Sequence, residues 1–328
     1  MPGFEARDRA DIFVAHDFPE QEIDLGEIRM NYATAGSSEL PALLLIPAQI
    51  QSWWAYEKAM ALLQGHFQVF AVDLRGQGRS TQTPGRYTLD NMGNDLVRFI
   101  DEVIGRPTIV SGNSSGGVLA AWLSAYAKPR QLRGAVCEDP PLFASETHPA
   151  CGHSIRQSIG PMFALANKWL GDQWSIGDWQ GMQGAAPKEV PMYVLGALVR
   201  MRIAQPPDPA GPGDPPQHFR EYDPEWARSF WTGAASASCD HERMLAGAKV
   251  PVLITHHYRE IDPGSGALMG AVSDQQVARA QELISAAGQP CQVVDLPDMA
   301  HAMHQHDPER FTTTVREWAA ELNGAELG

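Results

Sequence analysis

Apolar residues in the first part of the chain recur at the spacing of strands in some segments and at the spacing of helices in others. Four segments have the spacing of buried or half-buried strands: 28–36, 42–46, 68–72 and 107–112. Between and after them, 87–104 and 116–126 carry apolar residues at helical spacing. Strands that alternate with helices are typical of a mostly parallel sheet covered on both faces, so the pattern predicts an α/β fold.

The same pattern is interrupted once. After a further strand at 132–137, the chain becomes richer in Trp, Met, Pro and Gly until about 247. It then resumes with strands at 250–257 and 291–296 and helices at 273–287 and 307–322. We therefore predict a core domain of residues 1–140 and 248–328 and an inserted cap of residues 141–247.

Charge limits the kinds of partner. The 328 residues include 25 Lys and Arg against 39 Asp and Glu, which gives a formal net charge of −14. This charge repels phosphate backbones and anionic lipid surfaces, so we expect neither nucleic acid nor membranes as partners. The N-terminus has no basic segment followed by an apolar one, and no apolar run is long enough to span a bilayer. We expect a cytoplasmic protein without a membrane anchor.

A nucleophile motif follows the strand at 107–112. Gly112-Asn113-Ser114-Ser115-Gly116 fits G-x-S-x-G and precedes a helix, which is the context that the motif requires. Small residues at both ends permit a sharp, strained turn that exposes the serine hydroxyl. The alternative is a loop without chemistry or an anion site at a helix N-terminus. The context favours Ser114 as a nucleophile.

A serine nucleophile needs a base, which is expected near the C-terminus. Three histidines follow the last predicted strand, and His301 lies in the turn directly after it. We expect His304 and His306 at the surface or in contact with the cap. A three-histidine metal site lacks a matching carboxylate pattern, so we predict no metal and choose His301 as the base.

Two predicted strands end next to carboxylates that could orient the base. Glu138 and Asp139 follow one strand, and Glu260 and Asp262 follow the next. Because Glu138 and Asp139 are neighbours leaving a strand, only one of them is expected to face the histidine. We favour Asp139, with Glu260 or Asp262 as alternatives.

The segment 73–80, Asp-Leu-Arg-Gly-Gln-Gly-Arg-Ser, directly follows the strand at 68–72. Its glycines permit a tight turn that Asp73 and Arg75 can hold together. No chemistry is required of these residues, and a structural role is favoured.

Taken in order, D-L-R-G-Q-G-R-S, G-N-S-S-G and the late P-D-M-A-H resemble the α/β-hydrolase superfamily. More narrowly, the chain resembles the zearalenone lactonases. The doubled serine of G-N-S-S-G, A-V-C-E-D-P-P at 135–141 and P-E-W-A-R at 224–228 carry this resemblance. It implies an eight-stranded, mainly parallel sheet with a mostly helical cap inserted after the sixth strand.

The resemblance also implies roles for single residues. Asp139 matches the acid of a catalytic triad, and Trp226 matches a tryptophan that covers the bound lactone. The His-Gly pair usual in the superfamily is replaced here by Pro-Ala-Gln at 47–49. The oxyanion hole is then expected from the backbone amides of Gln49 and Ser115.

These features predict a serine hydrolase that opens the lactone ester of a bulky aromatic macrolactone such as zearalenone, as in mycotoxin degradation. The reaction would pass through an acyl-enzyme and need no cofactor. The expected partner is a small-molecule lactone or ester, with the chain forming a homodimer or homotetramer. The alternatives are a general carboxylesterase, a C–C hydrolase of aromatic degradation, or a ligand-binding receptor on the same fold.

Overall fold

One eight-stranded sheet organises the molecule. The computed structural model describes residues 12–170, 178–204 and 213–325. The strand order is β1-β2-β4-β3-β5-β6-β7-β10, with antiparallel pairing at β1–β2 and β2–β4 and parallel pairing beyond β4. The strands of this sheet are β1 (Glu20–Asp24), β2 (Arg29–Ala35), β3 (Ala42–Ile46), β4 (Gln68–Val72), β5 (Thr108–Asn113), β6 (Leu132–Glu138), β7 (Val252–His256) and β10 (Cys291–Asp295). The predicted mainly parallel α/β sheet is confirmed.

The helices divide between the core and the cap. Those of the core are η2 (Trp53–Tyr56), α1 (Glu57–Leu63), α2 (Leu89–Phe99), η3 (Ile100–Ile104), α3 (Ser115–Tyr126), α9 (His241–Leu245), α10 (Asp274–Ala286), α11 (Met303–His306) and α12 (Pro308–Ala325). Those of the cap are α4 (Gly160–Leu170), α5 (Trp179–Glu189), α6 (Met192–Arg200), α7 (Gln217–Arg220) and α8 (Glu225–Thr232). Among the helices of the described ranges, none is both long and apolar enough to cross a membrane.

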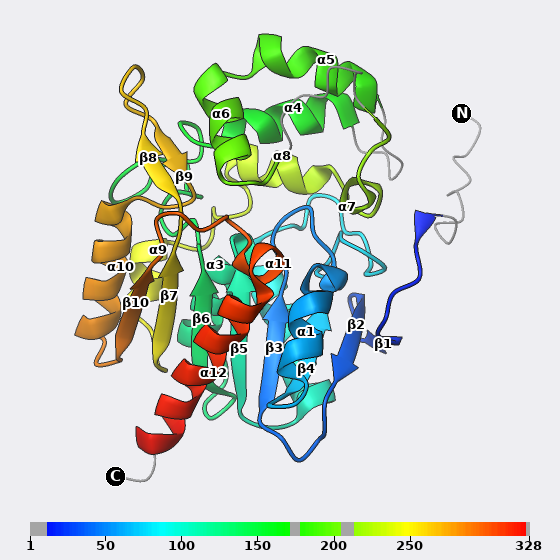
Figure 1. Ribbon diagram of the computed structural model, residues 1–328, viewed down its shortest axis with the longest axis vertical. Coiled ribbons are helices and arrows are strands. Elements are labelled where there is room, and N and C mark those ends of the chain that lie inside the picture. Colours follow the sequence, from blue (N-terminus) through cyan, green and yellow to red (C-terminus); the bar gives the residue numbers. More distant parts are fainter. Residues whose placement is uncertain (1–11, 171–177, 205–212, 326–328) are drawn as a thin grey trace.

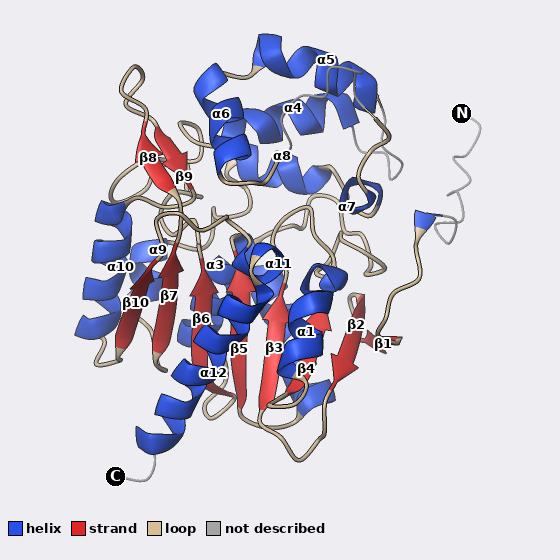
Figure 2. Cartoon of the chain, viewed as in Figure 1, coloured by secondary structure: helices blue, strands red, loops and turns tan. Residues whose placement is uncertain are grey.

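Alternating side chains of the strands fill two cores, one on each face of the sheet. On β3, Leu44 belongs to a core cluster that includes residues of α2, α3 and α10, whereas Leu43 and Leu45 belong to a second cluster with residues of α1 and α12. This follows from the two-residue period of a strand, which sends successive side chains to opposite faces. Figure 2 shows α1 and α12 on the near face of the sheet.

Two elements differ from the sequence pattern. The strand β1 was not predicted, because its sequence Glu-Gln-Glu-Ile-Asp belongs to an edge strand that is largely exposed and lacks an apolar face. The helix predicted at 87–104 begins at Leu89 after the N-cap Thr88 and changes to a π-helical turn at Ile100. It ends where Gly105 adopts a left-handed φ of 66°.

The cap helices α4, α5, α6 and α8 lie over the carboxyl ends of the parallel strands, as Figure 1 shows. A separate hairpin of β8 (Arg259–Ile261) and β9 (Leu268–Gly270) stands beside α6. Within the predicted cap range, α9 packs against α3 and α10 of the core. Residues 171–177 and 205–212 of that range lie outside the described residues.

Candidate active site

The turn between β5 and α3 holds Ser114 in a strained conformation. Its φ of 54° and ψ of −120° are rare for a residue with a side chain. A Cβ on Gly112 would lie 2.0 Å from the Gly116 carbonyl oxygen, and one on Gly116 would lie 2.3 Å from the Ile46 carbonyl oxygen. Only glycine therefore fits at these two positions, and the turn leaves Ser114 partly accessible between buried neighbours.

His301 and Asp139 meet beside this turn. The Nδ1 atom of His301 lies 2.6 Å from Oδ2 of Asp139. Burial acts to raise the pKa of Asp139, but the His257 imidazole and the hydrogen bond with His301 outweigh it, so the pKa is lowered. An ionised carboxylate only accepts hydrogen bonds, so Nδ1 carries the hydrogen and Nε2 is the nitrogen that can take a proton. The contact with Asp139 thus fixes the orientation of the His301 ring and leaves Nε2 without a bond to this carboxylate.

The backbone also brings Asp139 to this place. Asp139 has a positive φ of 43°, which is uncommon for a non-glycine residue. Its N–H donates to the Thr255 carbonyl at 2.9 Å, and its Oδ1 accepts from the His257 N–H at 3.2 Å. A backbone bond to β7 and a side-chain bond to the residue that follows β7 therefore fix the carboxylate where β6 ends.

The two alternative acids contact other groups. The Glu260 carboxylate accepts from Arg200 at 3.0 Å and from the Tyr258 hydroxyl at 2.9 Å, on the exposed hairpin. Asp262 accepts from the backbone and hydroxyl of Ser265, both at 2.7 Å. The structure brings Asp139 to His301 and does not bring these two carboxylates there.

Glu138 faces a second histidine. Its carboxylate contacts Nδ1 of His304 at 2.9 and 3.0 Å and accepts the His304 backbone N–H at 3.1 Å. Both residues are fully buried, so the expectation that His304 lies at the surface is wrong. Within the described ranges, no three His, Cys, Asp or Glu side chains gather closely enough to hold a metal ion.

The predicted oxyanion residues lie on segments that meet at the nucleophile turn. Ser115 is the first residue of α3, where backbone N–H groups have no acceptor within the helix. Gln49 follows β3, whose terminal carbonyl approaches Gly116. The Gln49 side chain donates to the Tyr222 hydroxyl at 2.5 Å, which links this segment to the cap. The role of both amides stays a prediction.

Trp226 occupies an internal position. It has no exposed surface, and its indole N–H donates to the Arg75 carbonyl at 2.6 Å. Gly76 lies against the indole, and the Gly76 carbonyl accepts from the Asp223 N–H at 2.9 Å. These contacts attach α8 to the turn after β4 and leave the indole without exposed surface. Its contact with substrate stays a prediction.

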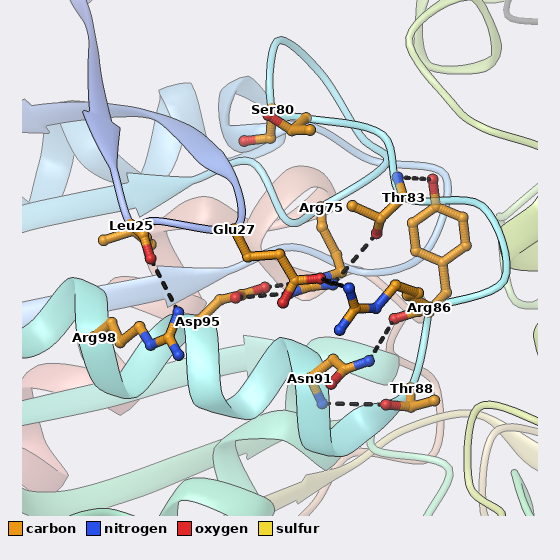
Figure 3. Close-up of polar contacts among 12 residues, drawn as sticks. Leu25, Glu27, Arg75, Ser80, Thr83, Arg86, Thr88, Asn91, Asp95 and Arg98 are labelled. Atoms are coloured by element: carbon orange, nitrogen blue, oxygen red, sulfur yellow. Dashed lines mark hydrogen bonds and ion pairs between the residues drawn. The ribbon is translucent and has the colours of Figure 1, made fainter.

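The turn after β4 has its polar groups satisfied internally. Figure 3 shows Arg75, which is buried, donating to both oxygens of Asp95 at 2.6 and 2.8 Å and contacting Glu27 and Thr83. The favoured structural role of this turn agrees with these contacts.

A second buried carboxylate holds the other side of the same turn. Asp73 accepts from the backbone N–H groups of Trp53 at 2.7 Å and Arg79 at 3.0 Å and from the Asn31 amide at 2.7 Å. Burial raises its pKa to about 7 although these hydrogen bonds lower it. Since Trp53 follows the segment of Gln49, Asp73 ties that segment to the turn.

Asn113 is a residue whose role the sequence did not indicate. Its side-chain amide donates to the His301 carbonyl at 2.9 Å and to the Glu138 carbonyl at 3.3 Å. It therefore joins the base loop to the end of β6 beneath the nucleophile. The G-x-S-x-G pattern marks this position but leaves its residue type open, so nothing in the motif pointed to a contact 188 residues away.

Comparison with known proteins places the chain in a family. The family model described as "Alpha/beta hydrolase family" matches residues 43–314, which is most of the 328-residue chain. The chain belongs to the α/β hydrolase family. The nucleophile turn and the late histidine lie within the matched range, whereas the strands β1 and β2 precede it.

Relatives of known name match shorter segments. A stretch of 104 residues, 32% of this chain, is 28% identical to 39% of 3-oxoadipate enol-lactonase 2 of Acinetobacter baylyi. Another of 183 residues, 51% of this chain, is 25% identical to 49% of epoxide hydrolase 3 of Mus musculus. The chain thus spans about half or less of the length of these relatives.

Solved structures match over nearly the whole chain. The enol-lactonase from Burkholderia xenovorans LB400 covers 92% of this chain and 100% of its own, with a TM-score of 0.64 and 17% identity. E-2-(Acetamidomethylene)succinate hydrolase covers 92% and 99%, with a TM-score of 0.60 and 19% identity. At these identities the likeness shows the fold alone.

Proposed function

We propose that this protein is a carboxylic ester hydrolase with Ser114 as nucleophile, His301 as general base and Asp139 as the acid that orients it. The observation that carries the proposal is the 2.6 Å contact between Asp139 and His301 beside the strained Ser114. A catalytic triad consists of a nucleophile, a base and a carboxylate that orients the base. Here the three proposed members lie after β5, β10 and β6 respectively. Family membership agrees with hydrolysis.

In the proposed mechanism, the Ser114 hydroxyl attacks the ester carbonyl while Nε2 of His301 takes its proton. The negative carbonyl oxygen accepts hydrogen bonds from the Gln49 and Ser115 amides. His301 then donates the proton to the leaving alkoxide, which leaves an acyl-enzyme on Ser114. A water deprotonated by His301 attacks the acyl group and releases the acid product.

For the substrate, we propose the lactone ester of a bulky aromatic macrolactone such as zearalenone. The motifs at 112–116, 135–141 and 224–228 support this class by their resemblance to zearalenone lactonases. The match to an enol-lactonase supports lactone hydrolysis more broadly. A general carboxylesterase or a C–C hydrolase would use the same three residues on another acyl group.

The first experiment measures zearalenone hydrolysis by the wild type and by Ser114→Ala, with chromatography of the ring-opened product. We expect turnover by the wild type and a loss of at least about 10⁴-fold in Ser114→Ala. If the wild type cleaves a simple activated ester but not zearalenone, the triad survives and the macrolactone assignment falls. Tight retention of the lactone without turnover would favour a receptor instead.

We also propose that the protein acts in the cytoplasm as a homodimer or homotetramer. Met192 on α6 is 70% exposed and Ile203 beyond it is 45% exposed, so the cap presents apolar side chains to its surroundings. Such side chains favour association between subunits. Light scattering of the purified protein tests the assembly, and a monomer at micromolar concentration contradicts it.

A further inference from the structure

A second carboxylate–histidine pair, Glu138 and His304, lies one residue from Asp139 and three residues from His301. The proposed mechanism gives it no task. Both side chains are fully buried, and the carboxylate receives both the ring N–H and the backbone N–H of His304. A carboxylate is costly to bury, and three contacts to a single residue are a specific means of satisfying it.

Glu138 touches the nucleophile turn through its backbone. Its carbonyl accepts the Ser114 N–H at 2.9 Å and the Asn113 side-chain amide at 3.3 Å. The same Asn113 amide donates to the His301 carbonyl at 2.9 Å. Glu138, which contacts His304, is therefore hydrogen-bonded directly to the nucleophile turn. The Asn113 side-chain amide also donates to the carbonyls of both Glu138 and His301.

His304 reaches the predicted oxyanion segment through a ring contact. Its imidazole stacks on Tyr56 with centroids 4.0 Å apart, and the Tyr56 hydroxyl donates to the Ile46 carbonyl at 3.0 Å. Ile46 ends β3 just before Gln49, and the same carbonyl packs on Gly116. Phe311 makes an edge contact with the same imidazole, with ring centroids 5.9 Å apart and ring planes at 65°.

The ring itself has no route to a substrate. Nε2 of His304 is buried and has no partner among the described residues. A hydrogen on Nε2 would have no acceptor, so the contacts favour the tautomer with hydrogen on Nδ1. A group enclosed in this way can act only through the residues that it holds.

We propose that Glu138 and His304 are positioning residues, a buried pair that holds the acid, base, nucleophile and oxyanion segments in register for the reaction. The inference rests on the proposed function, because it assigns the pair to that triad. Displacement of reacting groups by about 1 Å can cost about 10²-fold in rate. Loss of the pair should therefore reduce the rate of attack by Ser114 more than it changes substrate affinity.

The test uses a fluorophosphonate, which reports the reactivity of Ser114 without knowledge of the natural substrate. The Ser114 oxygen bonds to phosphorus, fluoride leaves, and His301 receives the serine proton. Labelling rates and the kcat and KM for an activated ester are measured for the wild type, His304→Leu, His304→Asn, Glu138→Gln and the exposed control His306→Asn. The amide nitrogen of Asn can take the place of Nδ1 as a donor to Glu138.

We expect labelling and kcat to fall about 10- to 100-fold in His304→Leu with KM within about twofold, and to recover in His304→Asn. His306→Asn should match the wild type. If folded His304→Leu labels as fast as the wild type, the pair is only structural and the inference falls while the triad stands. If His304→Leu does not fold, unchanged kcat in Glu138→Gln overturns the inference in the same way. Failure of the wild type itself to label overturns the proposed function.

Discussion

Two glycine-containing turns lie on either side of β3, one after β4 and one after β5, and they use their polar residues differently. In the turn after β4, Arg75 and Asp73 are buried and bonded to partners inside the protein. In the turn after β5, Ser114 is partly accessible, and the nearby His301 uses one ring nitrogen for Asp139. A turn whose polar side chains are all bonded inside the protein stabilises the fold, whereas a turn with a strained and accessible hydroxyl can do chemistry.

The largest difference between the two turns should appear in the activity of Asp139→Asn. The amide can no longer stabilise the imidazolium form of His301 or fix its tautomer, so we expect activity to fall about 10³- to 10⁴-fold. The melting temperature should change little in comparison. Steady-state kinetics on an activated ester, with calorimetry on the same samples, measures both.

The exposed carboxylates provide the controls. Glu260 pairs with Arg200, and Asp262 accepts from Ser265, so Glu260→Gln and Asp262→Asn should keep wild-type activity. If Asp139→Asn remains active while one of these variants is inactive, the acid has been assigned wrongly.

The second effect concerns stability at the turn after β4. Arg75→Ala would leave the buried Asp95 carboxylate without its two hydrogen bonds from the guanidinium. Removing one partner of a buried pair costs about 3 to 5 kcal/mol of the free energy of unfolding. Urea denaturation measures this loss.

Arg86 supplies a matched control, because it pairs with Glu27, a carboxylate that Arg75 also contacts, but its side chain is 59% exposed. Arg86→Ala should cost less than about 1 kcal/mol. Equal losses in the two variants would show that the burial of Arg75 adds nothing to the stability of the turn after β4.

Local sequence signals were enough to predict this contrast. Gly112 and Gly116 predict the strained turn because their lack of a side chain is a local requirement. The position of His301 after the last strand followed from the order of elements along the chain. That order left Asp139, Glu260 and Asp262 open as the acid, and the family resemblance favoured Asp139. Strands such as β3 carry their burial in their own residues, Ala-Leu-Leu-Leu-Ile, and were predicted for that reason.

Other features depend on residues distant in the chain. His304 looked like a surface residue because Tyr56 and Phe311, which enclose it, are not its neighbours in the sequence. The individual cap helices had no clear pattern either. For example, α5 contains Pro187, and a proline within a helix contradicts the local preference. Tertiary packing decides both cases.

The third effect is a pH dependence of stability from Asp73. Burial raises its folded pKa to about 7 from 3.8, so the folded protein binds a proton more tightly than the unfolded chain. Its contribution to stability is present in full below the unfolded pKa and is lost as pH rises through the folded pKa. Between pH 5 and 7 the loss is about 2 kcal/mol.

Urea denaturation of the wild type and Asp73→Asn at both pH values isolates this contribution. The wild type should lose about 2 kcal/mol more than the variant between pH 5 and 7. Glu146→Gln is a useful comparison, since burial also raises the pKa of Glu146 to about 7, at a site away from the turn. An equal pH slope in the wild type and Asp73→Asn would mean that Asp73 stays ionised in the folded protein.

The smallest effect separates two roles of Trp226. In Trp226→Phe the Arg75 carbonyl loses its indole donor, and we expect a cost of about 1 kcal/mol of stability. Trp231→Phe, a change at a partly buried position of the same helix, is the control and should cost less. If Trp226 only anchors α8, KM for the lactone stays at the wild-type value. A KM that rises in Trp226→Phe alone would mean that α8 moves to let substrate reach the indole, because the anchored position leaves the ring without exposed surface.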